Sequence, residues 1–268
     1  MGRRRLLDAA DHKLSSAPIS NGPSALSSIP ARFAKLDLNA VEHARYRDLR
    51  ESLQPFRHLF ADKRVLDFGA SYGLSAAVLI EFGASHVWGV EPELWRVEQG
   101  WEFLKKLGIA DRVELVHRED TAQLGVPDAS FGFVLANAVF EHIPQPRTAY
   151  IRELWRVVAP NGILMVRETP NKYLPADFHT LHLPLTNWLP SPVAHRIGTL
   201  LGKFSPARQD WESSGWRGMG HYEFVRAIPG PYILHHETTR RRHKLLRAIG
   251  LPSGLVDPYP VYVVRKPA

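Results

Sequence analysis

Short apolar runs alternate, through the middle of this chain, with segments in which apolar residues recur every three or four positions. The runs predict β-strands, at residues 64–68, 85–90, 112–116, 130–136 and 163–166. The periodic segments predict α-helices, at residues 74–82, 94–107 and 146–158. Strands and helices that alternate at this spacing form a parallel sheet with helices on both faces. The predicted fold class is therefore α/β and doubly wound.

The segment before this core changes character near residue 30. Residues 1–30 are rich in Ser and Pro and poor in large apolar side chains, so we expect a flexible tail. Residues 39–60 predict one or two helices, interrupted at Pro55, that form an N-terminal cover over the sheet. The apolar side of this cover is expected to comprise Val41, Tyr46, Leu49 and Leu53.

The segment after the fifth predicted strand is rich in Pro, His and Trp, with one short helix predicted at 191–201. An insertion of this length favours a lid or an acceptor pocket over a slack loop. Residues 232–249 then predict a basic helix and residues 260–265 a closing strand. We expect a single domain over 31–268, divided into a cofactor half (60–168), an acceptor lid (169–222) and a C-terminal helix and strand (223–268).

Composition narrows the function classes. The chain has 268 residues and no cysteine, which excludes disulfides, thiolate metal sites and a cysteine nucleophile. No apolar run approaches the roughly 18 residues that span a bilayer, and no apolar segment of a secretory signal follows the basic start, so we expect a cytoplasmic protein. The net charge of +7 is spread along the chain, which disfavours a nucleic-acid-binding stripe.

The first predicted strand ends at Asp67 and leads into a glycine-rich turn, Gly69 to Gly73. A dinucleotide-binding turn requires glycine at its first, third and sixth positions, where the backbone approaches a pyrophosphate. Here the third and sixth positions are Ser71 and Leu74. The pattern therefore disfavours a dinucleotide and leaves a different nucleoside-like ligand at the carboxyl end of the strand.

The stretch Asp67-Phe-Gly-Ala-Ser-Tyr-Gly73 resembles motif I of the class I S-adenosylmethionine-dependent methyltransferases. The resemblance extends through residues 130–143 and 154–164, with departures at Gly132 and Asn161. It implies a Rossmann-like, seven-stranded mixed sheet, with S-adenosylmethionine as the cofactor.

The same resemblance assigns cofactor-binding residues. Glu91, at the end of the second predicted strand, is expected to accept the ribose hydroxyls. Asp120 and Thr121, after the third, are expected to hold the adenine. The full set expected to contact the cofactor is Asp67, Gly69, Ser71, Gly73, Glu91, Asp120, Thr121 and Asn137.

Methyl transfer to a hydroxyl benefits from a base, and neutral histidine suits this role near pH 7. His142 follows the fourth predicted strand, and it either faces the acceptor or packs at a helix start. In the insertion, His179 or His182 is the other candidate base, oriented by Asp177; alternatively these groups hold the lid in place. Glu168, after the fifth strand, is either a structural or a site residue.

A divalent metal site is a less favoured alternative. Some methyltransferases of ribose or catechol-like hydroxyls carry a Glu-His pair after strand four, as this chain does at Glu141-His142, with a later His such as His179. They also use an earlier Glu, where this chain has Ala138. We therefore expect no metal.

The acceptor is the least determined part of the prediction. Residues 169–190 are similar to methyltransferases of bacterial surface glycan and glycolipid pathways, so we expect O-methylation of a small, sugar-linked or lipid-linked hydroxyl. An RNA ribose 2′-O-methyltransferase and a non-catalytic partner protein are the alternatives. Four aromatic residues either line the acceptor pocket or pack in the core: Tyr173, Trp188, Trp211 and Trp216.

Overall fold

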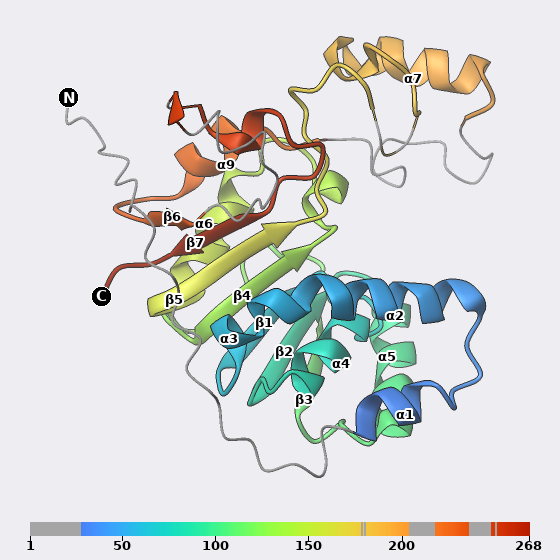
Figure 1. The fold of residues 1–268 in the computed structure, drawn as a ribbon, viewed down its shortest axis with the longest axis vertical. Helices are drawn as coiled ribbons and strands as arrows, with labels where there is room; N and C mark the ends of the chain where they lie inside the picture. Colours follow the sequence, from blue (N-terminus) through green and yellow to red (C-terminus); the bar gives the residue numbers. More distant parts are fainter. Residues whose placement is uncertain (1–27, 178, 180, 204–217, 236–247, 250) are drawn as a thin grey trace.

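A computed structural model of the chain describes residues 28–177, 179, 181–203, 218–235, 248–249 and 251–268 (Figure 1). Its centre is a seven-stranded sheet in the order β3-β2-β1-β4-β5-β7-β6. The first five strands are parallel, and β7 runs antiparallel to both β5 and β6. The strands are β1 Arg64–Phe68, β2 His86–Glu91, β3 Val113–His117, β4 Phe131–Asn137, β5 Val158–Arg167, β6 Ile233–His235 and β7 Tyr262–Arg265. The expected seven-stranded mixed sheet is confirmed.

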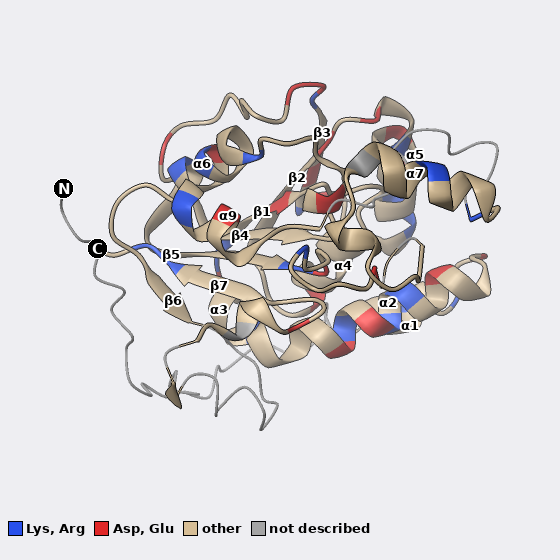
Figure 2. Ribbon diagram, turned by 90° about the horizontal axis from the view of Figure 1, so that it is seen from above, with Lys and Arg blue, Asp and Glu red and all other residues tan. Residues whose placement is uncertain are grey.

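Helices cover both faces of this sheet (Figures 1 and 2). Successive strand residues point to opposite faces, so Val65 joins the core beneath α1, α2, α4 and α5, whereas Leu66 joins the core beneath α6 and α9. The helices are α1 Ile29–Phe33, α2 Ala40–Leu53, α3 Arg57–Phe60, α4 Leu74–Glu81, α5 Leu94–Leu107, α6 Thr148–Val157, α7 Ser191–Leu200 and α9 His221–Ala227. Short 3₁₀ turns are η2 Gln54–Phe56, η3 Phe140–His142, η4 Thr186–Trp188 and η5 Ser253–Leu255.

The N-terminal cover begins earlier than the sequence pattern indicated. Ile29 and Phe33 on α1 are buried, and the Phe33 ring stacks on Tyr46 of α2 at 3.8 Å between centroids. The expected tail to residue 30 is therefore wrong at its end, while residues 1–27 lie outside the described part. Val41 is exposed, because the buried side of α2 turns with Tyr46 and Leu53 toward α4.

The C-terminal part differs more from expectation. The prediction of a basic helix over 232–249 is wrong at its start, because Ile233–His235 is strand β6, paired with β7. Residues 236–247 of that prediction lie outside the described part. Helix α9 was not anticipated; Glu223 accepts the Gly220 N–H (3.4 Å) at its start. The closing strand near 260–265 is confirmed as Tyr262–Arg265.

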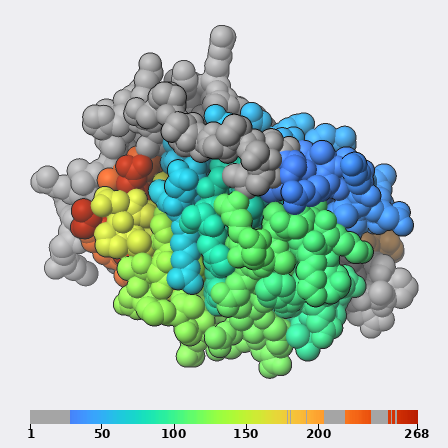
Figure 3. All heavy atoms as spheres, turned by 90° about the horizontal axis from the view of Figure 1, so that it is seen from below, coloured from blue at the N-terminus to red at the C-terminus, as the bar shows by residue number. Residues whose placement is uncertain are grey.

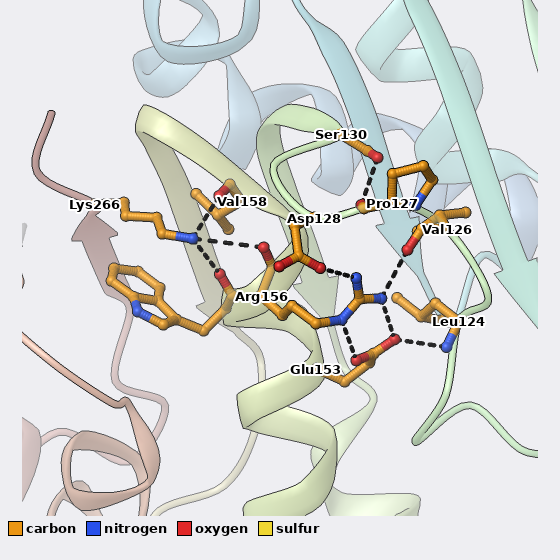
Figure 4. Close-up of polar contacts among 10 residues, drawn as sticks. Leu124, Val126, Pro127, Asp128, Ser130, Glu153, Arg156, Val158 and Lys266 are labelled. Atoms are coloured by element: carbon orange, nitrogen blue, oxygen red, sulfur yellow. Dashed lines mark hydrogen bonds and ion pairs between the residues drawn. The ribbon is translucent and has the colours of Figure 1, made fainter.

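The amino end of β5 carries a polar network that holds three segments together (Figure 4). Lys266 follows directly after β7. Its Nζ donates to the carbonyl of Trp155 (3.0 Å), near the end of α6, and to the carbonyl of Val158 (2.8 Å), at the start of β5. Arg156 binds Glu153 and Asp128, which ties the loop before β4 to the same helix. Figure 3 views the molecule from this side, where the start of β5 lies beside the end of β7. Since parallel strands begin here, this network lies at the edge opposite to their carboxyl ends.

Candidate functional site

The carboxyl ends of the parallel strands are the place where the sheet order reverses. From β1 the chain proceeds outward to β2 and β3, then returns to β4 on the other side of β1. Ligands of open α/β sheets bind at such a reversal, because the loops leave in opposite directions and open a crevice. The turn after β1 and the segment after β4 therefore define the candidate site.

The turn after β1 depends on its glycines. Gly69 has φ of +76° and Gly73, which begins α4, has φ of +89°, both in the left-handed region that favours glycine. A Cβ at Gly69 would lie 2.5 Å from Val139 Cγ2. The turn after β1 therefore packs directly on the residue two positions beyond β4. This contact brings the segment at residues 138–142 beside the predicted cofactor turn.

Glu91 connects the end of β2 to that turn. Its side chain is buried, and its two carboxylate oxygens accept the backbone N–H of Ser71 (2.8 Å) and of Glu93 (3.3 Å). Burial raises the pKa of Glu91, while the Ser71 N–H and the Arg96 charge act in the opposite direction. Each oxygen keeps a further lone pair, so the carboxylate remains able to accept hydroxyl donors.

Asp67 lies beneath the turn. It is buried and accepts a hydrogen bond of 2.6 Å from the hydroxyl of Ser75 in the first turn of α4. Burial, together with the nearby charge of Glu91 and against the Ser75 hydrogen bond, raises the pKa of Asp67 to about 7. The described contacts therefore place Asp67 as a support that joins β1 to α4.

The predicted adenine residues and Asn137 lie on neighbouring loops. Asp120 is exposed and accepts the Ala122 N–H at 2.9 Å, while Thr121 is half-buried. The Arg118 N–H donates to the Glu91 carbonyl at 3.0 Å, which holds this loop to the end of β2. Asn137 ends β4, and its buried Oδ1 has no hydrogen-bond partner in the part of the chain that the structure describes. An unsatisfied buried acceptor at this reversal fits a site that a ligand completes.

Glu141 and His142 form a pair just beyond the Val139 contact. Glu141 is buried; its Oε2 accepts the Thr169 hydroxyl (3.1 Å), and its Oε1 lies 4.0 Å from His142 Nε2. Burial raises the pKa of Glu141 to about 7, against the effects of Thr169 and Arg147. The His142 side chain is 49% exposed. The imidazole is therefore accessible to solvent, with a buried carboxyl beside it.

Asp177 organises the first loop of the insertion through backbone contacts. Its buried carboxylate accepts the N–H groups of His179 (2.8 Å) and Leu181. His179 is half-buried and His182 is exposed with φ of 54°. These contacts support the alternative in which Asp177 holds the lid in place, whereas its role as orienter of a histidine base stays a prediction.

Tyr259 was missed by the sequence reasoning. The pKa of its phenol is raised by burial and then by the charges of Asp177, Glu168 and Glu141, so it lies among side chains from three separate segments. Asn171 holds this C-terminal segment through an Nδ2 bond to the Asp257 carbonyl at 2.9 Å. No local pattern marks Tyr259, because its neighbours come from distant parts of the chain.

The other predicted site features have mixed outcomes. The Trp188 ring is exposed and its indole N–H donates to the Tyr173 carbonyl at 3.1 Å, so these two aromatic residues are neighbours. Trp211 and Trp216 lie outside the described residues. Within the described part, no three His, Asp or Glu side chains are grouped as metal ligands. Among the same residues, no helix is both long and apolar enough to cross a membrane.

A family model described as a methyltransferase domain matches residues 41–225. Among curated proteins, a sterol 24-C-methyltransferase of Gibberella zeae is 30% identical over 105 residues, 39% of this chain and 27% of that protein. A ubiquinone biosynthesis O-methyltransferase of Neisseria meningitidis is 29% identical over 116 residues, 42% of this chain and 48% of that protein. The chain thus spans less than half the length of these two relatives.

Solved structures share the fold. The YcgJ protein of Bacillus subtilis superposes with a TM-score of 0.54 at 15% identity, covering 83% of this chain and 99% of that one. A protein of Galdieria sulphuraria, assigned as a sarcosine dimethylglycine methyltransferase, superposes with a TM-score of 0.54 at 13% identity. The superposition covers 84% of this chain and 86% of that one. At these identities the superpositions establish the arrangement of strands and helices.

Proposed function

The chain belongs to the class I S-adenosylmethionine-dependent methyltransferase family, and from this premise we propose that it methylates the hydroxyl of a small or lipid-linked acceptor. The family model covers more than half of the chain, and the sheet has the family's order and direction. The proposal concerns this domain, because the curated relatives are much longer than the segment matched.

The cofactor fits the residues at the crevice. The backbone turn at Gly69 to Gly73 would hold the methionine moiety, Glu91 the ribose hydroxyls and Asp120 the adenine amine. The unsatisfied Oδ1 of Asn137 supplies a further acceptor at the same edge. S-adenosylmethionine supplies an electrophilic methyl group on a sulfonium, whose positive charge is lost on transfer. The protein therefore has to align the acceptor and exclude water rather than stabilise a new charge.

The contact between Gly69 and Val139 is the observation that carries the catalytic assignment. Val139 immediately precedes η3, so this contact supports a position of η3, which carries His142, near the predicted cofactor turn. A neutral imidazole accepts the hydroxyl proton near pH 7. Glu141 Oε1 lies 4.0 Å from His142 Nε2. When the Glu141 carboxyl is ionised, its charge is near enough to stabilise the imidazolium that forms as His142 takes the proton. We therefore propose His142 as the base, with Glu141 as its positioning residue.

The insertion is proposed to close over the acceptor. Asp177 fixes the loop that carries His179, and Leu181 is fully buried in a small core with Ala194. Tyr259 approaches Asp177, Glu168 and Glu141 from the C-terminal segment. These contacts give the crevice a wall opposite the cofactor turn, which supports a role in excluding water. His179 and His182 remain the alternative bases on this wall.

The acceptor class is proposed from two relatives. One is named for a sterol and the other for ubiquinone biosynthesis, so lipid-like hydroxyl or ring acceptors are favoured over sugars. The sterol enzyme is named for C-methylation, which makes methyl transfer to carbon the second candidate function. An RNA acceptor is distinguished by salt, because affinity for a polyanion falls steeply as salt concentration rises.

The first experiment is a calorimetric titration with S-adenosylmethionine, followed by transfer of a labelled methyl group to a panel of sterols, prenylated phenols, glycolipids and RNA. We expect saturable binding and labelling of a lipid-like phenol. The absence of binding heat at high protein concentration would leave the non-catalytic alternative.

His142→Gln tests the base. We expect kcat to fall by about 10²–10⁴-fold with unchanged cofactor affinity, since general-base catalysis contributes that range. His58→Gln, on the exposed surface of α3, is the control. Full activity of His142→Gln would transfer the role to His179 or His182.

A further inference from the structure

Helix α7, in the insertion, presents its apolar side to solvent. Residues 193, 197 and 200 lie on one face of a helix, because they are spaced by four and three positions. On α7 these are Val193, which is 46% exposed, Leu200, which is 78% exposed, and Ile197, which is half-buried. The buried residues of α7 are the small Ala194 and Gly198, which lie beside this stripe. A helix of a globular protein normally buries its large apolar stripe, so this orientation requires an explanation.

The segments beside α7 carry further exposed apolar residues. Trp188, in the turn before the helix, is 62% exposed although its indole N–H is satisfied by the Tyr173 carbonyl. Leu185 and Leu201 are also exposed. Figure 1 shows α7 standing clear of the sheet, beyond the carboxyl ends of β4 and β5. We call this the insertion surface: Leu185, Trp188, Val193, Arg196, Leu200 and Leu201.

The insertion has a small hydrophobic core of its own. Leu181 and Ala194 are buried against Leu183 and Leu189, and this cluster is separate from the two cores on the faces of the sheet. The exposed apolar residues are therefore not the remainder of a poorly filled interior. They are exposed beside this cluster, and exposed apolar residues gathered in one segment mark interaction sites.

The charge of the segment identifies the partner. Residues 178–209 contain no Asp or Glu, and Arg196 lies on the same face of α7 as the apolar stripe. Lys203 follows three residues after the end of the helix. Helix α7 itself carries one Lys or Arg residue, Arg196, and no Asp or Glu (Figure 2). Exposed aliphatic groups, an exposed tryptophan and basic side chains on and beside one short helix match the interface of an anionic bilayer, where rings and aliphatic groups enter the headgroup region.

We propose that the insertion surface binds the surface of an anionic lipid membrane. Since α7 has ten residues, it lies in the interface and does not span the bilayer. Leu94 and Trp95, exposed at the start of α5 just beyond β2, lie at the same edge of the sheet. Docking by this edge turns the crevice toward the lipid phase. The inference goes beyond methyl transfer and stands without it.

Vesicle flotation tests the proposal. The wild-type protein is mixed with vesicles of phosphatidylcholine alone or with about 30% phosphatidylglycerol. We expect it to float with the anionic vesicles and to remain unbound with the neutral ones. Val193→Ser with Leu200→Ser should reduce the bound fraction by about tenfold or more, because two apolar side chains no longer enter the interface.

Matched variants separate binding from folding. Val193→Ile with Leu200→Ile keeps the stripe apolar and should float as the wild type does. Arg196→Glu should weaken binding to anionic vesicles, whereas Arg152→Glu, on the exposed side of α6, should not. Calorimetric titration with S-adenosylmethionine reports whether each variant is folded. A wild-type protein that binds no cofactor but floats would overturn the proposed function and leave the membrane proposal intact.

Three results would overturn the membrane proposal: a wild-type protein that never floats, a serine variant that floats equally well, or equal losses from Arg196→Glu and Arg152→Glu. A concentration-dependent dimer that dissociates in the serine variant, without vesicle binding, would assign the insertion surface to a second copy of the chain instead.

Discussion

Glu91 Oε2 accepts the backbone N–H of Ser71 at 2.8 Å, so the carboxylate at the end of β2 holds the turn after β1. One side chain therefore shapes the turn after β1 and keeps lone pairs that, in the proposed function, would accept the ribose hydroxyls. Burial raises the pKa of Glu91, so keeping this carboxyl ionised costs free energy. A hydrogen-bond donor on a bound ligand would offset that cost.

Glu91→Gln separates these two roles. The amide oxygen keeps an acceptor for the Ser71 N–H, but the charge is lost. We expect S-adenosylmethionine to bind about 1–3 kcal/mol more weakly, while thermal stability stays at or above that of the wild type. Calorimetry and thermal unfolding measure the two effects. Glu98→Ala, exposed on α5, is the control, and equal affinity in Glu91→Gln and wild type would place the ribose elsewhere.

Gly69→Ala tests the contact between the turn and Val139. The new Cβ meets Val139 Cγ2 at 2.5 Å and the φ of +76° strains any side chain, so we expect a loss of about 2–5 kcal/mol in unfolding free energy. Gly230→Ala has the same strain at φ of +78° with no neighbour within 4 Å, and should lose about 1 kcal/mol.

Denaturant unfolding of both variants, with and without Val139→Ala, isolates the steric part. Removing the valine methyl groups should recover stability in Gly69→Ala but not in Gly230→Ala. Identical losses for the two glycine variants would show that the turn does not pack on Val139.

Asp67 predicts a pH dependence of stability. Its folded pKa of about 7 exceeds that of an unfolded aspartate, so the folded state holds the proton more tightly. Its contribution is therefore greatest at low pH and is lost as pH rises from about 4 through about 7. Relative to Asp67→Asn, the wild type should lose about 2–4 kcal/mol across this window. Unfolding titrations between these limits measure it, with Asp111→Asn as the exposed control; parallel curves for wild type and Asp67→Asn would contradict the assignment.

Lys266→Met tests the network at the opposite edge of the sheet (Figure 4). The variant leaves the carbonyls of Trp155 and Val158 without their donor, so we expect a loss of about 1–3 kcal/mol in stability. Cofactor affinity should not change, because the network lies away from the crevice. Lys105→Met removes an exposed ion pair and should leave stability unchanged. Impaired cofactor binding in Lys266→Met would link the two edges.

The parallel core was predictable because each element has a local cause. The strands are continuous apolar runs and α6 has buried residues at helical spacing, so pattern alone located them within a few residues. The predicted boundary between α6 and the fifth strand was wrong, because β5 begins at Val158, directly after the helix. Pro160 to Gly162 form an irregularity inside the strand pairing instead of a loop. Pairing with β4 sets the start of β5, and no local pattern in the sequence reports that pairing.

The sequence by itself determined the fold class, the glycine-rich turn after β1 and the acidic residue at the end of β2, because glycines with positive φ and strand-end carboxylates are needed at set spacings. Only the tertiary structure decided which segments come together: Val139 on Gly69, Tyr259 near enough to Asp177 and Glu141 for their charges to raise its pKa, and β6 on β7. It also showed the large apolar side chains of α7 facing outward, since a helical period states that a helix has two faces but not which one is buried. Packing between segments far apart in the chain makes that choice.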